Sequence, residues 1–364
     1  MPVLAALRQF APPPSYLSLP SVGVDISDTS LKYIRFSPAD RQGERRLSLW
    51  GDIDIPSNVL NRGHVEDQEQ LSAVLAEFRK ATGAAFVRVS LPEERAYLFE
   101  TSIKRGVPMK EVRSLLEFRF EENVPIPLRE ALFDYEVLPT IEESREVRVA
   151  VAAYARETIT RYFDACVAAG LTPITFEVEA QAMGRAVVPA TAETETVMLI
   201  DFGKTRTGVG IVNGGTLMYT STIDIGGGQL SQVLRKTLGD VPEAEITKIK
   251  NTEGLVRGEH NTRSYEALAS TISVIKDEIA ARMQYWHTRK GNRGEGRISS
   301  IILCGGSSNL KGLPEYLSDS LKVPCTRANV WQKAFDTSAV VPPIDRRHSY
   351  GYATAIGLAL GSIA

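Results

Sequence analysis

Two apolar, strand-like segments that lie far apart in the chain each end in an aspartate and lead into a short polar turn. The first is Val22-Gly-Val-Asp25, and the second is Val197-Met-Leu-Ile200 followed by Asp201. In each case a second apolar stretch follows the turn, over residues 31–36 and 208–212, as expected of a β-hairpin. A duplicated fold with this pattern would place the two aspartates opposite each other across a cleft.

Strand and helix patterns alternate along most of the remaining sequence, which favours a layered α/β architecture. Apolar alternation predicts strands over residues 47–55, 87–91, 97–103, 131–138, 147–154, 174–178 and 216–223. Apolar positions three and four residues apart predict helices over residues 67–81, 108–122, 157–169, 180–187, 228–238, 244–250 and 265–286. Residues 86–154 group strands and one helix into a small α+β unit.

Composition excludes several classes of function. The 42 basic and 44 acidic residues give a formal net charge of -2, so the chain has no general basic field and we expect no nucleic-acid partner. Three scattered cysteines form neither a disulfide framework nor a CxxC metal site, and the four histidines share no metal-ligand spacing. No segment reaches the roughly 20 apolar residues of a membrane span, so we expect a cytoplasmic protein that meets a membrane only through partners.

Both acidic turns carry the residue types that bind a nucleotide triphosphate. The first reads Asp25-Ile-Ser-Asp-Thr-Ser-Leu-Lys32, and the second reads Asp201-Phe-Gly-Lys-Thr-Arg-Thr207. A strand-end aspartate can hold hydrated Mg²⁺, while hydroxyls, a lysine and a close backbone approach at Gly203 can meet phosphate oxygens. A plain solvated turn is the alternative for each hairpin taken alone.

A third element has the same order of strand and turn. Ile301-Ile-Leu-Cys-Gly-Gly-Ser-Ser-Asn-Leu310 is an apolar strand that enters Gly305-Gly306 and then a predicted helix. Such a small turn lets a flat base or a ribose lie against the backbone. Simple α/β packing uses the same pattern, so the order of the three elements carries the specificity.

In this order, the elements resemble the superfamily of actin, sugar kinases and heat-shock ATPases over residues 21–364. The chain most resembles the PilM family of the type IV pilus assembly platform, a branch close to the cell-division protein FtsA. The segments that carry this likeness are Gly63-His-Val-Glu-Asp67, Val89-Ser-Leu-Pro92, Val124-Pro-Ile-Pro127, Phe133-Asp-Tyr-Glu136, Ala169-Gly-Leu-Thr-Pro173, Glu177-Val-Glu-Ala180, Asp224-Ile-Gly-Gly-Gly228, Ala244-Glu-Ile-Thr-Lys248 and Ala355-Ile-Gly-Leu-Ala359.

The resemblance implies ATP and Mg²⁺ as ligands and assigns their contacts. The phosphates would lie between one side formed by Asp25, Ser27, Thr29, Ser30 and Lys32 and another formed by Asp201, Gly203, Lys204, Thr205 and Thr207, with Gly226, Gly227 and Gly228 completing the cradle. Asp25 and Asp201 would hold Mg²⁺ through water. Glu245 and Lys248 would reach the ribose and base, with a surface ion pair as the alternative, and Gly305, Gly306 and Ser307 would line the adenosine.

Two positions bear on the strength of binding and on hydrolysis. The superfamily usually has glycine soon after the first aspartate, whereas this chain has Ser27, whose Cβ narrows the approach to phosphate and whose hydroxyl can replace a lost backbone contact. Glu179 lies where relatives carry a water-positioning residue, with a helix-start carboxylate as the alternative. We therefore expect at most a slow ATPase.

The resemblance also implies the domains and the partners. We expect a flexible leader over 1–20; a first actin-like lobe from 21–85, 155–195 and 349–364; an inserted interaction subdomain over 86–154; a second lobe from 196–240 and 298–348; and a nucleotide-capping subdomain over 241–297. The groove between the inserted subdomain and the first lobe would take the N-terminal cytoplasmic peptide of a PilN-like inner-membrane protein. Other platform proteins, the assembly ATPase and self-association are further expected contacts, at the inner face of the cytoplasmic membrane.

Two other functions stay open at this stage. A sugar or acid kinase of the same superfamily would need a catalytic aspartate at the cleft, and only Asp224 comes near that description. A filament-forming cytoskeletal protein is compatible with the fold because head-to-tail contacts can repeat.

Overall fold

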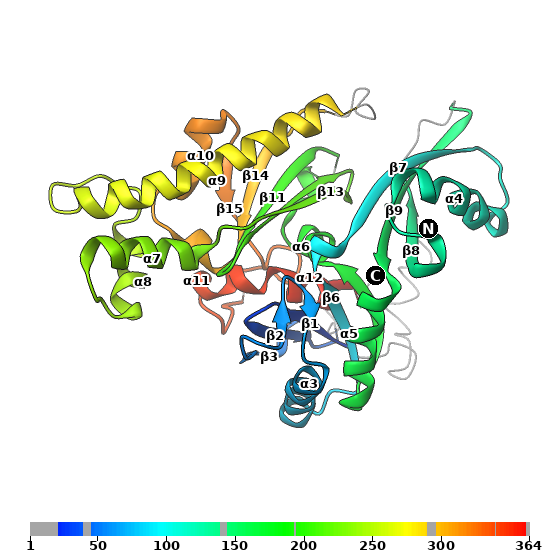
Figure 1. Cartoon of the computed structure of the whole chain (residues 1–364), viewed down its shortest axis with the longest axis horizontal. Helices are drawn as coiled ribbons and strands as arrows, with labels where there is room; N and C mark the ends of the chain where they lie inside the picture. Colours follow the sequence, from blue (N-terminus) through cyan, green and yellow to red (C-terminus); the bar gives the residue numbers. More distant parts are fainter. Residues whose placement is uncertain are drawn as a thin grey trace.

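The computed structural model describes residues 21–38, 45–138, 144–192, 194–289, 296–338 and 340–361. The leader expected over residues 1–20 and the last residues of the C-terminal segment lie outside these ranges. The described residues form two five-stranded sheets, one three-stranded sheet and one two-stranded ribbon, with helices between and around them (Figure 1). This layered arrangement confirms the α/β class that the alternating sequence pattern predicts.

The first lobe is built on a sheet with the strand order β10-β6-β1-β2-β3. β2 pairs antiparallel with both β1 and β3, whereas β1, β6 and β10 run parallel. The strands are β1 (Ser21–Ile26), β2 (Ser30–Phe36), β3 (Leu47–Asp54), β6 (Phe86–Leu91) and β10 (Thr172–Val178), and the ribbon pairs β4 (Leu60–Asn61) with β5 (His64–Val65).

Helices α3 (Gln68–Thr82) and α5 (Arg156–Ala168) pack together beside this sheet. Asp67 caps α3 by accepting a hydrogen bond from the Gln70 amide at 2.9 Å, and Gly83 ends the helix in the left-handed region, at φ 65°. The apolar stripe of α3 is buried, as its spacing predicts.

Helices α6 (Glu179–Val187) and α12 (Ala353–Gly361) lie between the two large sheets (Figure 1). Two glycines permit their close approach. A Cβ on Gly23 of β1 would lie 2.4 Å from the Ala355 carbonyl oxygen, and a Cβ on Gly357 would lie 1.7 Å from that of Ala182. The backbones of β1, α6 and α12 therefore touch where any side chain would separate them.

The second lobe repeats the plan of the first, with the strand order β13-β12-β11-β14-β15. Its long helix α9 buries a stripe that runs from Leu268 to Trp286. The elements are β11 (Thr196–Phe202), β12 (Thr207–Asn213), β13 (Thr216–Ile223), β14 (Ser300–Cys304), β15 (Cys325–Arg327), α7 (Gly227–Leu238), α8 (Glu243–Thr252), α9 (Thr262–Thr288) and α10 (Leu313–Leu321), with α11 (Arg346–Ser349) and the 3-10 turns η3 (Ala190–Ala192), η4 (Gly306–Asn309) and η5 (Tyr350–Tyr352).

Between β6 and α5 the chain forms the inserted unit that the sequence indicates. The 3-10 turn η1 (Glu93–Arg95) leads into a sheet with the order β7-β9-β8, covered by α4, and this unit has an apolar core of its own around Leu116 and Phe120. The elements are β7 (Tyr97–Lys104), α4 (Met109–Asn123), η2 (Leu128–Glu130), β8 (Ala131–Val137) and β9 (Glu146–Ala155).

One predicted element differs in detail. The strand ending at Cys304 runs into η4, and the following helix, α10, begins only at Leu313. Gly305, at φ 81°, and Gly312, at φ 78°, both adopt left-handed backbone, which keeps η4 separate from α10. The glycine turn is thus a tight bend at the cleft rather than the direct start of a long helix.

Candidate functional site

The two acidic hairpins are the β1–β2 and β11–β12 turns, one from the centre of each large sheet. Asp25 pairs with Lys32 in the first hairpin, and Asp201 pairs with Gly208 in the second. Each aspartate stands at or next to the end of its strand, so both carboxylates project from the same type of position in the two lobes. The duplicated pattern seen in the sequence is therefore a duplicated structure.

In the first hairpin the hydroxyls and the lysine are organised by the turn itself. The Ser27 amide donates to the Ser30 carbonyl at 3.0 Å, and the Ser27 hydroxyl donates to the same oxygen at 3.0 Å. The Lys32 ammonium donates to the Ser30 hydroxyl. Asp25 accepts a hydrogen bond from the Ser90 hydroxyl of β6 at 2.9 Å. Three of the predicted phosphate ligands, Ser27, Ser30 and Lys32, thus form one connected group, and Asp25 is held from β6.

In the second hairpin the backbone joins three of the predicted segments. The Gly203 carbonyl accepts hydrogen bonds from the Gly227 amide and the Ser307 hydroxyl, both at 2.9 Å, and the Lys204 carbonyl accepts from the Gly228 amide at 2.8 Å. The hairpin, the glycine triplet and the glycine turn after β14 therefore meet at one place, although the sequence separates them widely.

Several glycines at this junction have no room for a side chain. A Cβ on Gly226 would lie 2.5 Å from the Arg206 amide nitrogen, and one on Gly227 would lie 2.0 Å from the Ser307 hydroxyl. A Cβ on Gly305 would lie 2.4 Å from an Asp201 carboxylate oxygen. Gly306, in contrast, has no heavy atom within 4 Å of its Cβ position. The backbone formed by these glycines is therefore closely packed at Gly226, Gly227 and Gly305 and open at Gly306.

Three predicted ligands point elsewhere or pair with each other. Thr207 is fully buried, and its hydroxyl donates to the Ile225 carbonyl at 2.7 Å, so it holds the hairpin to the segment before α7. Glu245 and Lys248, on exposed positions of α8, form an ion pair with 3.2 Å between Lys248 Nζ and Glu245 Oε1. The surface ion pair that the sequence left open is thus the arrangement in this structure.

The two aspartates sit in an environment that favours a cation. Burial raises the pKa of Asp25, against the attraction of Lys32 and a hydrogen bond from Ser90. Burial, and then the charge of Asp25, raise the pKa of Asp201 to about 6, against the opposing effects of Lys32 and Arg206. Two desolvated carboxylates that repel each other are stabilised by a positive ion between them.

The donor set fits hydrated Mg²⁺ better than an enclosed metal. Among the described residues, no group of three or more His, Cys, Asp or Glu side chains converges on one point. Mg²⁺ usually keeps several waters and takes one or two carboxylates together with substrate phosphates. Asp25 and Asp201 provide the two carboxylates, and the glycine cradle provides the space beside them.

Glu179, the first residue of α6, belongs to the same acidic region. Burial raises the pKa of its carboxyl well above the ordinary range, with further contributions from Asp25, Glu93 and Glu94, while Arg206 opposes the shift. In the ligand-free cleft this carboxyl therefore keeps its proton to higher pH than an ordinary glutamate.

Sequence reasoning missed four charged residues at this site: Asp28, Glu93, Glu94 and Arg206. The Arg206 guanidinium lies 3.0 Å from an Asp28 oxygen in the first hairpin and 2.5 Å from a Glu94 oxygen in η1. Glu93 is 5% exposed and accepts a hydrogen bond from the Thr220 hydroxyl at 3.3 Å. Glu93 and Glu94 could have been found from their position just after a buried strand, where a second lobe can cover them.

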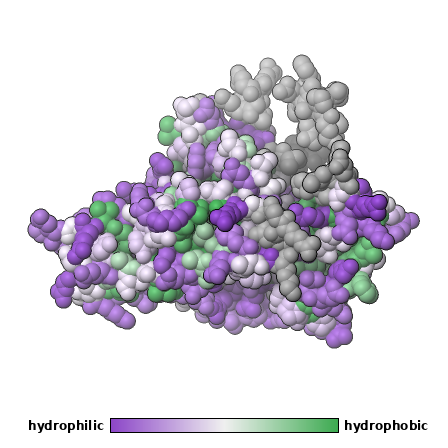
Figure 2. All heavy atoms as spheres, turned by 90° about the horizontal axis from the view of Figure 1, so that it is seen from above, coloured by the Kyte–Doolittle hydropathy of each residue, from purple (hydrophilic) through white to green (hydrophobic). Residues whose placement is uncertain are grey.

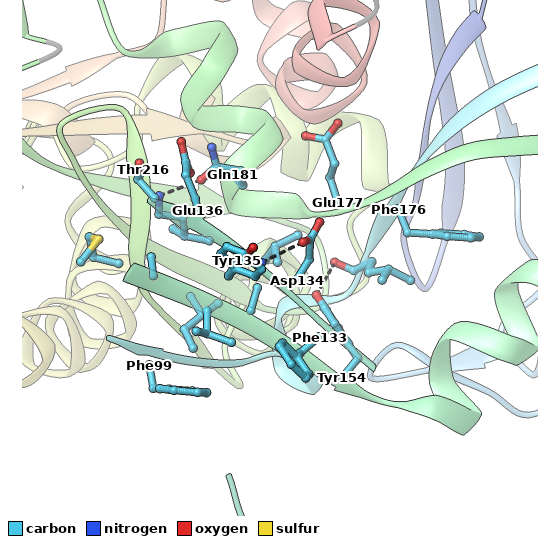
Figure 3. Close-up of a pocket in the computed structure, with 18 of the residues that line it drawn as sticks. Phe99, Phe133, Asp134, Tyr135, Glu136, Tyr154, Phe176, Glu177, Gln181 and Thr216 are labelled. Carbon is cyan, nitrogen blue, oxygen red and sulfur yellow. Dashed lines mark hydrogen bonds between the residues drawn. The ribbon is translucent and has the colours of Figure 1, made fainter. Parts of the chain in front are cut away.

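A cavity of about 460 Å³ lies between the inserted subdomain, the first lobe and β13 (Figure 3). We call it the subdomain groove. It is mainly apolar, and its walls come from β7, β8 and β9 on one side and from β10, α5 and α6 on the other; they include Leu98, Leu132, Phe133, Tyr154, Ile159, Phe176, Leu217 and Met218. The resemblance implies a groove between the inserted subdomain and the first lobe, and this cavity lies at that place.

Three polar side chains of the subdomain groove, Glu177, Gln181 and Arg185, are held by defined partners. Glu177 and Arg185 form an ion pair at 2.5 Å, and Arg185 also donates to the Gly357 carbonyl at 2.8 Å. The Gln181 side chain accepts from the Leu217 amide at 2.7 Å. β8 and β10, which both line the groove, are edge strands of their sheets among the described residues. The groove therefore combines apolar walls with strand edges.

On the face shown in Figure 2, hydrophobic side chains lie in small groups between hydrophilic ones. Within the described ranges, none of the helices has both the length and the apolar character needed to cross a bilayer.

Comparison with known proteins connects this geometry to a family. A family model described as type IV pilus assembly protein PilM matches residues 23–363. A solved PilM-PilN type IV pilus biogenesis complex superposes with a TM-score of 0.76, covering 95% of this chain and 99% of that one at 20% identity. MreB5 of Spiroplasma citri, solved with ADP, superposes with a TM-score of 0.51, covering 86% and 94% at 12% identity. The fold is therefore actin-like.

A curated relative supports the FtsA-like branch. The cell division protein FtsA of Neisseria meningitidis serogroup B is 27% identical over 223 residues, which make up 57% of this chain and 51% of FtsA. The chain thus spans about half the length of this curated relative.

Proposed function

Because the chain belongs to the family of type IV pilus assembly proteins PilM, we propose that it is an ATP-binding scaffold of the pilus assembly platform. In this proposal the subdomain groove holds the N-terminal cytoplasmic peptide of a PilN-like inner-membrane protein. The observation that carries it is the apolar groove between the inserted subdomain and the first lobe, bordered by two edge strands. The protein would be held at the inner face of the cytoplasmic membrane by this peptide.

The shape and chemistry of the groove suit an extended peptide. An edge strand offers unpaired backbone N–H and C=O groups, and alternate side chains of an added strand can enter apolar pockets. In the groove, β8 and β10 supply the edges, and Phe133, Tyr154 and Phe176 supply aromatic walls (Figure 3). The Glu177–Arg185 ion pair gives a charged point that can fix the direction of the peptide.

For the nucleotide, we propose the contacts that the resemblance assigns, apart from the hydroxyl of Thr207. Mg²⁺ bound to the phosphates would supply charge neutralisation between Asp25 and Asp201. The phosphate oxygens would be contacted from the two hairpins by Lys32 and by the hydroxyls of Ser27, Thr29, Ser30 and Thr205. Lys204 would reach the phosphates from an exposed position. The open side of Gly306 would face the adenosine. Glu245 and Lys248 would have to separate from each other in order to reach the ribose.

Hydrolysis would be slow at most. Glu179 is the proposed residue for positioning water, and burial raises the pKa of its carboxyl, which disfavours the ionised form that a general base needs. The kinase alternative lacks support, because Asp224, its only candidate, is exposed and forms an ion pair with Arg62. No specific observation favours a filament.

The five-part domain division remains our proposal for how the chain is organised. The separate apolar core of the inserted subdomain supports its boundaries, and the packing of α8 and α9 against α7 of the second lobe supports a capping subdomain. Contacts with other platform proteins, with the assembly ATPase or between copies of the chain belong to the same proposal.

The groove is tested by titrating the protein with a labelled synthetic peptide of the cytoplasmic N-terminus of the PilN-like protein from the same organism. Leu132→Arg places a charge on the groove wall, and we expect it to weaken binding at least about tenfold, which corresponds to about 1.4 kcal/mol. Phe118→Arg is the matched control, because Phe118 lies on the same subdomain at 78% exposure and outside the groove. Absence of binding, or equal binding by both variants, would contradict the proposal.

A further inference from the structure

Arg206 occupies a position between the two proposed phosphate-binding hairpins. It lies at the tip of the second hairpin, between Thr205 and Thr207, and its side chain is only 16% exposed. Its two ion-pair partners come from two other segments, namely Asp28 of the first hairpin and Glu94 of η1. A single guanidinium therefore joins the second lobe to two parts of the first.

Both ion-pair partners of Arg206 are carboxylates. Burial acts to lower the pKa of the guanidinium, but the charges of Glu94, Asp28 and Glu179 outweigh this effect and raise it overall. The two ion pairs use Nη2 toward Asp28 and Nε toward Glu94. A planar guanidinium with several donors suits the oxygens of a carboxylate or of a phosphate, so an arriving phosphate could replace one carboxylate.

The place of Arg206 in the cleft indicates which phosphate of a nucleotide it would contact. A cavity of about 510 Å³ opens at the tips of the hairpins, and its walls include Asp28, Thr29, Arg62, Thr205, Arg206 and Asp224 but none of the residues at 226–228 or 305–307. Those residues are assigned to the cradle and to the adenosine, whereas Thr29 and Thr205 are proposed phosphate contacts. Arg206 thus stands at the end of the cleft away from the proposed adenosine surface, where the last phosphate of a triphosphate would lie.

We infer that Arg206 is the γ-phosphate contact through which the cleft distinguishes ATP from ADP, exchanging Asp28 for the γ-phosphate when ATP binds. The inference rests on the proposed nucleotide function and names its specificity-determining residue. The exchange breaks an ion pair between the lobes and forms a charge-assisted hydrogen bond with the ligand. Glu94, next to Glu93 at the base of the inserted subdomain, remains the second partner of the guanidinium.

The test compares Mg-ATP and Mg-ADP affinities of the full chain by calorimetry. We expect the unmodified protein to bind ATP more tightly than ADP. Arg206→Gln should lower the affinity for ATP by about 10- to 100-fold, which is the range expected for loss of a hydrogen bond to a charged group. The affinity for ADP should change by less than about twofold. Arg129→Gln is the control, because Arg129 also forms an ion pair, with Glu130, at an exposed position that lines neither cavity. It should leave the ratio of the two affinities unchanged.

The thermal unfolding midpoint shows whether Arg206→Gln still folds. If it does not, Asp28→Asn tests the same inference. This variant leaves Arg206 in place and removes its competing carboxylate, so ATP affinity should rise while ADP affinity stays the same. Equal changes for both nucleotides in either variant, or an unmodified protein that binds both equally, would overturn the inference while leaving the proposed nucleotide site intact. Binding of neither nucleotide by the unmodified protein would overturn both.

Discussion

Arg206 and Asp28 join the two hairpins of the cleft, with 3.0 Å between a guanidinium nitrogen of one and a carboxylate oxygen of the other. A second ion pair between the lobes, Arg62 with Asp224, lies at the mouth of the same cleft. Opposite charges thus bridge the space where the phosphates of a nucleotide are proposed to lie. Binding of an anion there must compete with these pairs.

Asp201→Asn separates the ligand role of this carboxylate from its effect on stability. Since the pKa of Asp201 is raised to about 6 from 3.8, the folded protein holds a proton that the unfolded chain has released between those values. The contribution of Asp201 to the free energy of unfolding is therefore most favourable below about pH 4. It falls by on the order of 2 kcal/mol as the pH rises to about 6. Urea unfolding across this pH range should show a smaller decrease for Asp201→Asn.

The same variant should bind Mg-ATP at least about tenfold more weakly, because a neutral amide attracts the cation less than a carboxylate does. Asp319→Asn, on an exposed aspartate of α10 in the same lobe and outside both cavities, is the control for both measurements. A variant that binds ATP as well as the unmodified protein would remove Asp201 from the nucleotide site.

Gly208→Ala should destabilise the protein strongly, because the new Cβ would lie 1.9 Å from a Glu93 carboxylate oxygen in a buried contact between the lobes. We expect a loss of about 1 to 3 kcal/mol in the free energy of unfolding, the usual range for overpacking. Glu93→Ala in the same chain should recover part of it, and a double-mutant cycle measures the coupling. Additive losses would mean that the two residues do not meet.

Glu93→Gln should leave stability at pH 7 nearly unchanged. Burial raises the pKa of Glu93 well above the ordinary range, with further contributions from Glu94 and Asp201, so its carboxyl tends to the neutral form that an amide imitates. The amide oxygen can still accept the hydrogen bond from Thr220. A large loss of stability at pH 7 would indicate that Glu93 is ionised in the folded protein.

Gly306→Ala and Gly227→Ala should act differently. Gly306 has open space at its Cβ position, so alanine there should leave the unfolding midpoint unchanged and lower ATP affinity by occupying the proposed adenosine surface. Gly227→Ala would place a Cβ 2.0 Å from the Ser307 hydroxyl and should lower the unfolding midpoint as well. Unchanged ATP affinity in Gly306→Ala would place the adenosine elsewhere.

Local patterns in the sequence predict the elements of this fold well. The spacing of Leu71, Val74, Leu75 and Phe78 decides which face of one helix is buried, and the structure confirms it. Val22, Val24 and Ile26 are buried as well, but β1 is a central strand in which Gly23 is also buried, so both of its faces are covered. The two aspartate hairpins were recognisable because the fold repeats them.

Contacts between distant segments were not predictable in the same way. Nothing near Arg206 in the sequence points to Glu94, because their ion pair depends on how the second lobe sits against η1. The walls of the subdomain groove likewise come from eight strands and helices, so no continuous segment reveals them. The burial that shifts the pKa of Glu179 is also a property of the assembled cleft.

Nucleotide binding between the two hairpins is the property on which the other proposals about the cleft depend. Calorimetric titration of the full chain with Mg-ATP, with phosphate release followed on the same sample, measures it most directly. We predict saturable binding with one nucleotide per chain and little phosphate release over the titration. Absence of binding would contradict the proposed function and would leave the actin-like fold as a docking surface for the peptide alone.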